Sequence, residues 1–242
     1  MAVKYATEAF VFKKEDRMDA DRIFSVFTRD FGRLEIFGKA IRHINSKLRG
    51  GLELFSFSEI EFIQGKNKKI LTDALLQKRY GALAKEPEKF AVANAIARVL
   101  GDFIKGQEVD PGIWDFIADI FEKLQDPATN SKLLYYYFFW NFISLLGYRP
   151  ELANCVACRQ ALNPASLYFS YAGGGIACNM CAAHDKTATK VNADTVKILR
   201  LMVKQEWGML LKLKVSPPSK KMLKAISDSY YHYLNDNAHY AN

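Results

Sequence analysis

The chain has 242 residues, which is enough for one large domain or two modest ones with a buried core. Half of the residues are apolar, and no apolar run approaches the roughly 20 residues that a membrane-spanning helix needs. The net charge of +8 favours a polyanionic partner, nucleic acid before an anionic membrane. The first residues carry no secretory pattern, so we expect a cytoplasmic protein without a membrane partner.

The first 80 residues show the pattern of short β-strands. Aromatic and branched residues fill 5–12, and side chains alternate in polarity over 22–28 and 33–39, on either side of a tight reversal. A run at 52–63, a turn at 65–68 and a candidate strand at 69–75 follow. Five short strands predict a small barrel of the OB type, although an SH3-like barrel would give a similar pattern.

Beyond a predicted linker at 81–89, the apolar period becomes that of helices. Apolar stripes run through 90–103 and 113–124, and Asp110 with Pro111 predicts an N-cap and a first helical position. Residues 133–146 are apolar on nearly all sides, as in a helix buried within a bundle. We therefore expect an α+β protein with a five-stranded OB-fold barrel at 1–80 and an all-α domain at 90–242.

The four cysteines of the chain stand in two C-x2-C pairs that are nineteen residues apart, at Cys155, Cys158, Cys178 and Cys181. Two such knuckles enclose one tetrahedral Zn²⁺ with Zn–S distances of about 2.3 Å. Two disulfides, or four unrelated thiols, are the alternatives, and a reducing cytoplasm disfavours the disulfides. The spacing predicts a zinc knuckle at 152–184, inserted into the helical domain. His184 is a possible substitute for one thiolate.

Four sulfur ligands leave no position for a water molecule, so we expect the zinc to be structural. The sequence also lacks catalytic motifs. It has four histidines, no H-E-x-x-H or G-x-S-x-G pattern, and no Gly-Lys-Ser/Thr after the glycines at 173–175. We therefore predict a protein that is not an enzyme and has no catalytic residues.

Positive charge is concentrated in one segment of the predicted barrel. Residues 39–49 hold four Lys or Arg, one His and no acid, and long cations without neighbouring acids suit phosphate oxygens. A solvated loop is the alternative interpretation. The candidate nucleic-acid contacts are Lys39, Arg42, His43, Lys47 and Arg49, with Arg29 and Arg33 beside the reversal. Further candidates are Lys13, Lys14, Arg17, Lys66, Lys68 and Lys69, with Phe31 and Phe37 for base stacking.

Several stretches resemble the RecO family of bacterial recombination mediators. These are TEAFVF and DRIFSVFTRDFGRLEIFGKAIRHINSKLRGGLELF in the N-terminal part, then LLGYRPELANCVACR and CNMC in the C-terminal half. The resemblance covers most of the chain. Two departures stand out: Arg159 replaces the glycine that is familiar after the first C-x2-C pair, and the fifth-strand region, KKILTDALL, is poor in the acids that relatives often carry there.

The resemblance implies a DNA repair protein that binds single- and double-stranded DNA and anneals complementary strands in the cytoplasm, on the nucleoid. It also implies help in loading RecA onto single strands covered by coat protein. The implied partners are RecR and the acidic C-terminal tail of the single-strand-binding protein. The family's DNA contacts fall on Lys39 and Arg42, and its zinc ligands fall on the four cysteines. An RNA-binding or translation-linked protein is the first alternative, and an enzyme such as a nuclease is the second.

Overall fold

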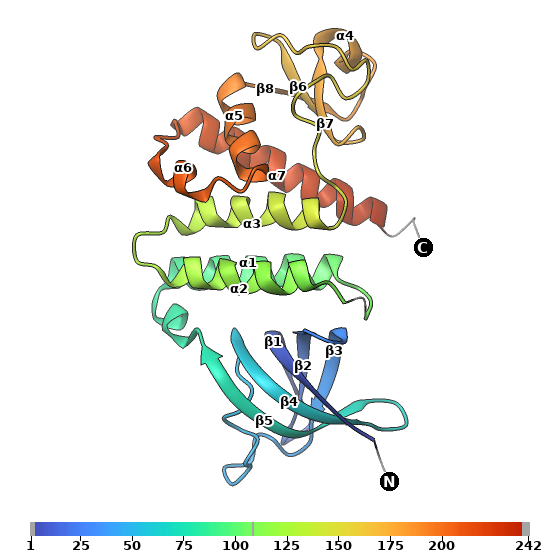
Figure 1. Ribbon diagram of the computed structural model, residues 1–242, viewed down its shortest axis with the longest axis vertical. Coiled ribbons are helices and arrows are strands. Elements are labelled where there is room, and N and C mark those ends of the chain that lie inside the picture. The colour runs from blue at the N-terminus through green and yellow to red at the C-terminus, as the bar shows by residue number, and fades with distance from the viewer. Residues whose placement is uncertain (1–2, 108, 239–242) are drawn as a thin grey trace. The chain divides into compact units, whose positions relative to one another are not determined.

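The computed structural model describes residues 3–107 and 109–238, and the chain divides into two compact units, Met1–Ser131 and Lys132–Asn242. The first unit holds a barrel and two α-helices, and the second holds the remaining helices and a small sheet (Figure 1). Among the described residues, no helix combines the length and the apolar composition that crossing a bilayer requires.

Five strands close into a barrel in the order β1-β2-β3-β5-β4, and β1 pairs with both β2 and β4. Only the β3–β5 pair is parallel among these strands. The five-stranded OB-type barrel predicted from the sequence is confirmed. The strands are β1 (Lys4–Arg17), β2 (Asp21–Thr28), β3 (Gly32–Gly38), β4 (Ser56–Gln64) and β5 (Lys69–Arg79).

The interior of the barrel is filled by one face of each strand. In β3, Leu34 and Ile36 are buried, whereas Glu35 and Phe37 face outward, as the period of two requires. The connection from β3 to β4 adds Ile41 and Leu52 to the same apolar core. That connection is therefore anchored to the barrel at both ends, and most of the residues between Ile41 and Leu52 are exposed.

A 3-10 helix, Gly81–Lys85, leads from the barrel to α1 (Pro87–Phe103) and α2 (Pro111–Gln125). These helices belong to the same compact unit as the barrel, whereas the sequence predicted a linker at 81–89 and a helical domain from residue 90. Aromatic contacts tie α2 to the strands: the Phe10 and Phe121 ring centroids are 4.7 Å apart, and the Phe57 and Trp114 centroids are 5.2 Å apart. The Asp110 side chain accepts from the Ile113 N–H, as an N-cap does.

The second unit is built around α3 (Ser131–Leu145), in which residues 137–143 are all buried. Trp140 stacks on Tyr230 at 5.4 Å, and its indole N–H donates to the Ser227 hydroxyl at 2.9 Å. A three-stranded sheet in the order β7-β6-β8 carries one of the cysteines, Cys178, at the end of β7. The remaining elements are β6 (Leu167–Ser170), β7 (Gly175–Cys178), α4 (Asn179–Ala182), β8 (Ala188–Val191), α5 (Ala193–Val203), α6 (Trp207–Lys212) and α7 (Pro217–Ala238).

Candidate nucleic-acid interface and metal centre

Residues 39–49, here called the basic loop, leave the barrel directly after β3. Three backbone hydrogen bonds between residues three apart fold the loop into successive turns. The Asp21 carboxylate accepts from the Ala40 N–H at 2.7 Å, and Ile41 is buried in the barrel core. Because Ile41 points inward, Lys39 and Arg42 are exposed on either side of it. The sequence thus folds the segment so that its cations face solvent.

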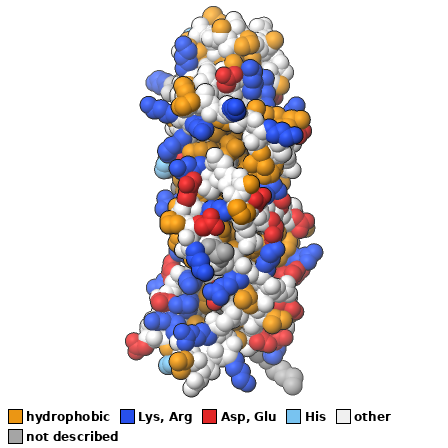
Figure 2. All heavy atoms as spheres, turned by 90° about the vertical axis from the view of Figure 1, so that its left-hand side faces the viewer, with side chains coloured by type: hydrophobic (Ala, Val, Ile, Leu, Met, Phe, Trp, Pro, Cys, Tyr) orange, Lys and Arg blue, Asp and Glu red, His pale blue; other side chains and the backbone are white. Residues whose placement is uncertain are grey.

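Most cations of the basic loop have no acid partner among the described residues. Lys39, His43, Lys47 and Arg49 are exposed, and none forms an ion pair with any residue in the described part of the chain. The lower part of Figure 2, which shows the barrel, has Lys and Arg side chains across the middle of this face. The structure therefore brings these four predicted residues together on one loop.

Arg42 is partly engaged. Its guanidinium lies 3.6 Å from the Asp16 carboxylate and donates to the Met18 carbonyl at 3.5 Å. Asp16 already accepts a shorter hydrogen bond from Arg22 at 2.7 Å, and that bond, more than the charge of Arg42, lowers the pKa of Asp16. Arg42 is thus the weaker partner of Asp16, and its side chain is 38% exposed.

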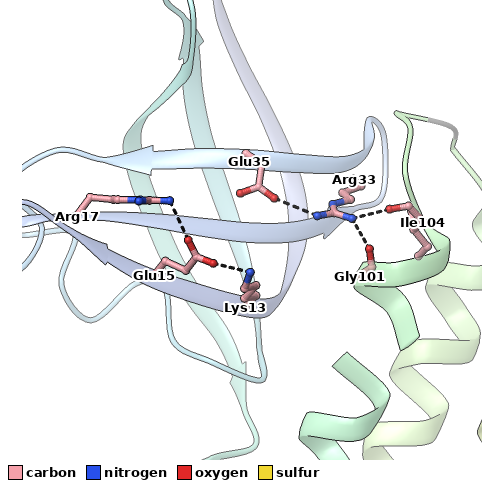
Figure 3. Close-up of polar contacts among 7 residues, drawn as sticks. All are labelled: Lys13, Glu15, Arg17, Arg33, Glu35, Gly101 and Ile104. Carbon is pink, nitrogen blue, oxygen red and sulfur yellow. Dashed lines mark hydrogen bonds and ion pairs between the residues drawn. The ribbon is translucent and has the colours of Figure 1, made fainter. Parts of the chain in front are cut away.

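Arg29 and Arg33 lie outside the basic loop and are both engaged. Arg29 pairs with Glu8 at 2.6 Å on the exposed surface. The Arg33 guanidinium donates to the carbonyls of Gly101 and Ile104 at 2.7 and 2.8 Å, where α1 ends, and it lies 3.4 Å from Glu35 (Figure 3). Arg33 therefore caps a helix, a role that the sequence did not predict.

The two aromatic candidates for base stacking have different surroundings. The Phe31 ring packs against Tyr5 and Phe62, with centroids 5.8 and 5.7 Å away, so it contributes to the barrel. Phe37 is half-buried on the outer face of β3, and the Lys68 ammonium lies 3.4 Å from its ring centroid. Of the two, Phe37 has a ring face toward the outside, covered by a flexible cation.

The four cysteines converge at one point in the second unit. The sulfur atoms of Cys155, Cys158, Cys178 and Cys181 all lie within 4.8 Å of one another. A tetrahedral ion with metal–sulfur distances of about 2.3 Å places its ligands about 3.8 Å apart, and the Cys158 and Cys178 sulfurs are 3.9 Å apart. All four thiols are free, and that separation is far from a disulfide bond. The donor set fits a single metal ion.

The backbone around Cys155 is arranged to hold a thiolate. The Cys178 N–H donates to the Cys155 sulfur at 3.3 Å. Burial disfavours the Cys155 thiolate, but N–H groups of Cys158, Cys178 and Ala157 outweigh burial and lower the pKa of Cys155 to about 6. His184 is exposed in the connection after α4 and is not part of the sulfur cluster. The four cysteines are thus the ligand set that the geometry supports.

The fold and these two sites define an OB-fold protein with a helical second part that carries a four-thiol knuckle. Family models named "Recombination protein O N terminal" and "Recombination protein O C terminal" match residues 1–79 and 84–238. The chain belongs to the RecO family.

Curated relatives agree with this assignment along nearly the whole chain. A protein of Dehalococcoides mccartyi named "DNA repair protein RecO" is 30% identical over 212 residues, which is 88% of this chain and 83% of the relative. Proteins with the same name from Desulforamulus reducens and Caldanaerobacter subterraneus are 27% and 26% identical, over 95% and 93% of this chain and 89% and 90% of their own lengths.

Proposed function

We propose that this protein is a DNA repair and recombination mediator that binds single- and double-stranded DNA and anneals complementary strands. We further propose that it acts with RecR to help RecA load onto coat-protein-covered single strands. The observation that carries the proposal is the set of unneutralised cations on the basic loop of an OB-type barrel. OB-folds bind oligonucleotides through their strands and loops, and Lys and Arg side chains without acid partners are suited to phosphate oxygens.

Annealing needs no covalent catalyst. Two complementary strands repel each other through their phosphates, and base pairing releases free energy only after the strands have met. A surface of lysine and arginine side chains weakens that repulsion and raises the local concentration of strands. The basic loop supplies such a surface because four of its five basic side chains have no acid partner among the described residues. On this proposal the protein acts by binding.

The test is the double substitution Lys39→Ala/Arg42→Ala. Removing two phosphate contacts should lower affinity for single-stranded DNA by about tenfold at 0.1 M salt, and it should reduce the salt slope by about 0.7 for each contact. Both side chains are exposed, so thermal stability should change little. Fluorescence anisotropy with a labelled oligonucleotide measures affinity, and an annealing assay with and without coat protein measures the activity.

A matched control removes one lysine and one arginine elsewhere: Lys85→Ala/Arg98→Ala, at two exposed residues of the same unit that are not candidate DNA contacts. If the control weakens DNA binding as much as the test variant, net charge rather than the basic loop is responsible. Annealing of DNA in the presence of coat protein also separates this proposal from an RNA-binding or translation-linked function, which requires no such activity.

We propose that the metal is one structural Zn²⁺ ion. Four thiolates around one tetrahedral position favour zinc, and they leave no open position for a reacting water molecule. The ion would join β7 and α4, which carry Cys178 and Cys181, to the first knuckle at Cys155 and Cys158. Its contribution would be to the stability of this segment, since the free energy of zinc binding in such knuckles is also free energy of folding.

We propose that the acidic tail of the single-strand-binding protein docks in the second unit. A cavity of about 610 Å³ there is lined by Leu152 and Val203, with three cations, Arg149, Arg200 and Lys204, and one acid, Glu151, around them. Arg149 and Lys204 are exposed, whereas Arg200 donates to the Leu152 carbonyl at 3.0 Å. An apolar floor with a cationic rim suits an acidic peptide that ends in an apolar residue.

The double substitution Arg149→Ala/Lys204→Ala should weaken the binding of such a peptide by about tenfold, because two rim charges are lost. Fluorescence anisotropy with a labelled acidic peptide measures the affinity. Lys212→Ala/Lys214→Ala removes two exposed lysines of the same unit that do not line the cavity and serves as the control. Equal peptide affinity in the wild type and in the rim variant would remove this cavity from consideration.

A further inference from the structure

A second basic surface lies beside the barrel, away from the basic loop. It is a cleft of about 740 Å³ between the β4–β5 turn and the segment that follows α1, all within the first unit. Four cations line the cleft, Arg33, Lys68, Lys69 and Lys105, and Glu35 is the only acid among its described lining residues. The cleft is thus strongly positive.

The one arginine of this cleft already has partners, namely the one acid and the carbonyl groups at the end of α1. Arg33 donates to the two carbonyls at the end of α1 and lies beside the Glu35 carboxylate (Figure 3). Lys68, Lys69 and Lys105 have no ion pair with any residue that the structure describes. Three like charges around one cleft repel each other, and an anion with several charges would relieve that repulsion.

The lining of the cleft favours a nucleic acid over an acidic peptide. Leu34 supplies the only apolar side chain among the described lining residues, and Leu34 is itself buried in the barrel core. A peptide pocket needs apolar surface for side chains. Here the amides of Gln64, Asn67 and Gln107 accompany the lysines, and amides can donate to phosphates and pair with base edges.

The strand register separates this cleft from the basic loop. β5 runs parallel to β3 with Lys69 opposite Ile36, so the turn before Lys69 lies toward the start of β3, whereas the basic loop begins after its last residue, Gly38. Figure 1 shows the β4–β5 turn and the connection after β3 on different sides of the barrel. Within residues 3–107 and 109–238, the chain therefore carries two basic surfaces on which most cations have no acid partner.

We propose that the cleft formed by the β4–β5 turn and the segment after α1 binds the sugar-phosphate backbone of a second nucleic-acid strand, while the basic loop holds the first. This inference rests on the proposed function, and it explains how one chain would bring two strands together. Lys68, Lys69 and Lys105 contact phosphates of the second strand, and the side-chain amides contact its sugars or bases.

The test uses the full chain with two samples of oligo(dT), one carrying a donor dye and one carrying an acceptor, because oligo(dT) cannot pair with itself. Energy transfer reports two strands on one chain. The wild type and the control Lys212→Ala/Lys214→Ala, which removes two exposed lysines outside the cleft, should show transfer. Lys68→Ala/Lys105→Ala should bind the first strand normally and the second about tenfold more weakly at 0.1 M salt. Circular dichroism checks that each variant is folded.

Each other outcome overturns the inference in a distinguishable way. Undiminished transfer in Lys68→Ala/Lys105→Ala shows that the cleft is not the second site. A wild type that binds a single strand also rejects the second site but leaves the proposed function in place, whereas a wild type that binds no strand rejects both. A poly-glutamate peptide of equal charge that displaces the second strand as well as oligo(dT) does would assign the cleft to acidic peptides.

Discussion

Arg159 adopts a backbone conformation that usually belongs to glycine. Its φ is 62°, in the left-handed region, and its N–H donates to the Cys155 carbonyl at 2.9 Å. This turn brings the first pair of cysteines around one point. A residue with a Cβ atom lowers the stability of this conformation by about 1 kcal/mol relative to glycine. Arg159 therefore makes the first knuckle less stable than a glycine would. The arginine in place of the family's glycine should therefore lower the free energy of unfolding by a measurable amount.

Arg159→Gly should raise the free energy of unfolding of the metal-loaded protein by about 0.5–1 kcal/mol, because the left-handed turn becomes unstrained while the unfolded chain gains some entropy. The substitution also removes a 3.8 Å pair between Arg159 and Glu151, but Arg159 is 72% exposed and that pair contributes little. Thermal unfolding followed by circular dichroism measures the change. Arg159→Ala loses the same pair but keeps Cβ, so a gain of equal size in that variant would contradict the strain argument.

At the scale of elements, the strands that alternate in polarity were predictable and the extensions of those strands were not. The sequence predicted a first strand at 5–12, but β1 continues to Arg17. The added residues, 13–17, are all charged, and they pair with β2. The side chains of Asp16 and Arg22 form a 2.7 Å hydrogen bond across this pair of strands. A run of charged residues does not show the pattern of a strand in the sequence, because such a strand is stabilised by contacts between neighbouring strands and not by burial in a core.

The region before β4 shows the opposite error. The run at 52–63 counted as one of the five predicted strands, but β4 begins only at Ser56. Leu52 and Phe55 are buried, and Phe55 has a positive φ of 57°, so this stretch is a bent segment that folds inward. Apolar character alone cannot distinguish a strand from a buried loop of this kind.

The two candidate sites differ in the same way. The metal centre was predictable because the spacing within each C-x2-C pair constrains the local geometry. The role of Arg33 was not, because its hydrogen-bond partners Gly101 and Ile104 lie 68 and 71 residues along the chain. Only the packing of α1 on the barrel brings them together. The positive cleft was likewise visible only in part, since Lys68 and Lys69 stand in a basic run but Lys105 is distant in sequence.

The junction between β3 and α1 gives a test of these roles. Arg33→Ala should lower the free energy of opening at the end of α1 by about 2 kcal/mol, because a partly buried charged donor with two carbonyl partners is lost. Amide hydrogen exchange at residues 97–104 should accelerate by about thirtyfold. Arg29→Ala, which removes only an exposed pair with Glu8, should leave those amides unchanged. Equal effects of the two substitutions would show that Arg33 does not support the helix.

At the scale of the whole molecule, the division into two compact units separates the basic loop, in the first, from the sulfur cluster, in the second. We therefore expect metal removal to act locally. A chelator strong enough to overcome a zinc affinity of about 10–16 kcal/mol should unfold the segment at 152–184, because that affinity is its folding energy. Proteolysis should then cut this segment, while the affinity of the basic loop for single-stranded DNA changes less than about threefold.

Cys155→Ser/Cys181→Ser should reproduce the effect without chelator. The prediction is wrong if the metal-free protein keeps the circular dichroism of the barrel but binds DNA more than tenfold more weakly. The knuckle would then belong to the DNA interface, since a purely structural ion has no direct contact with phosphates.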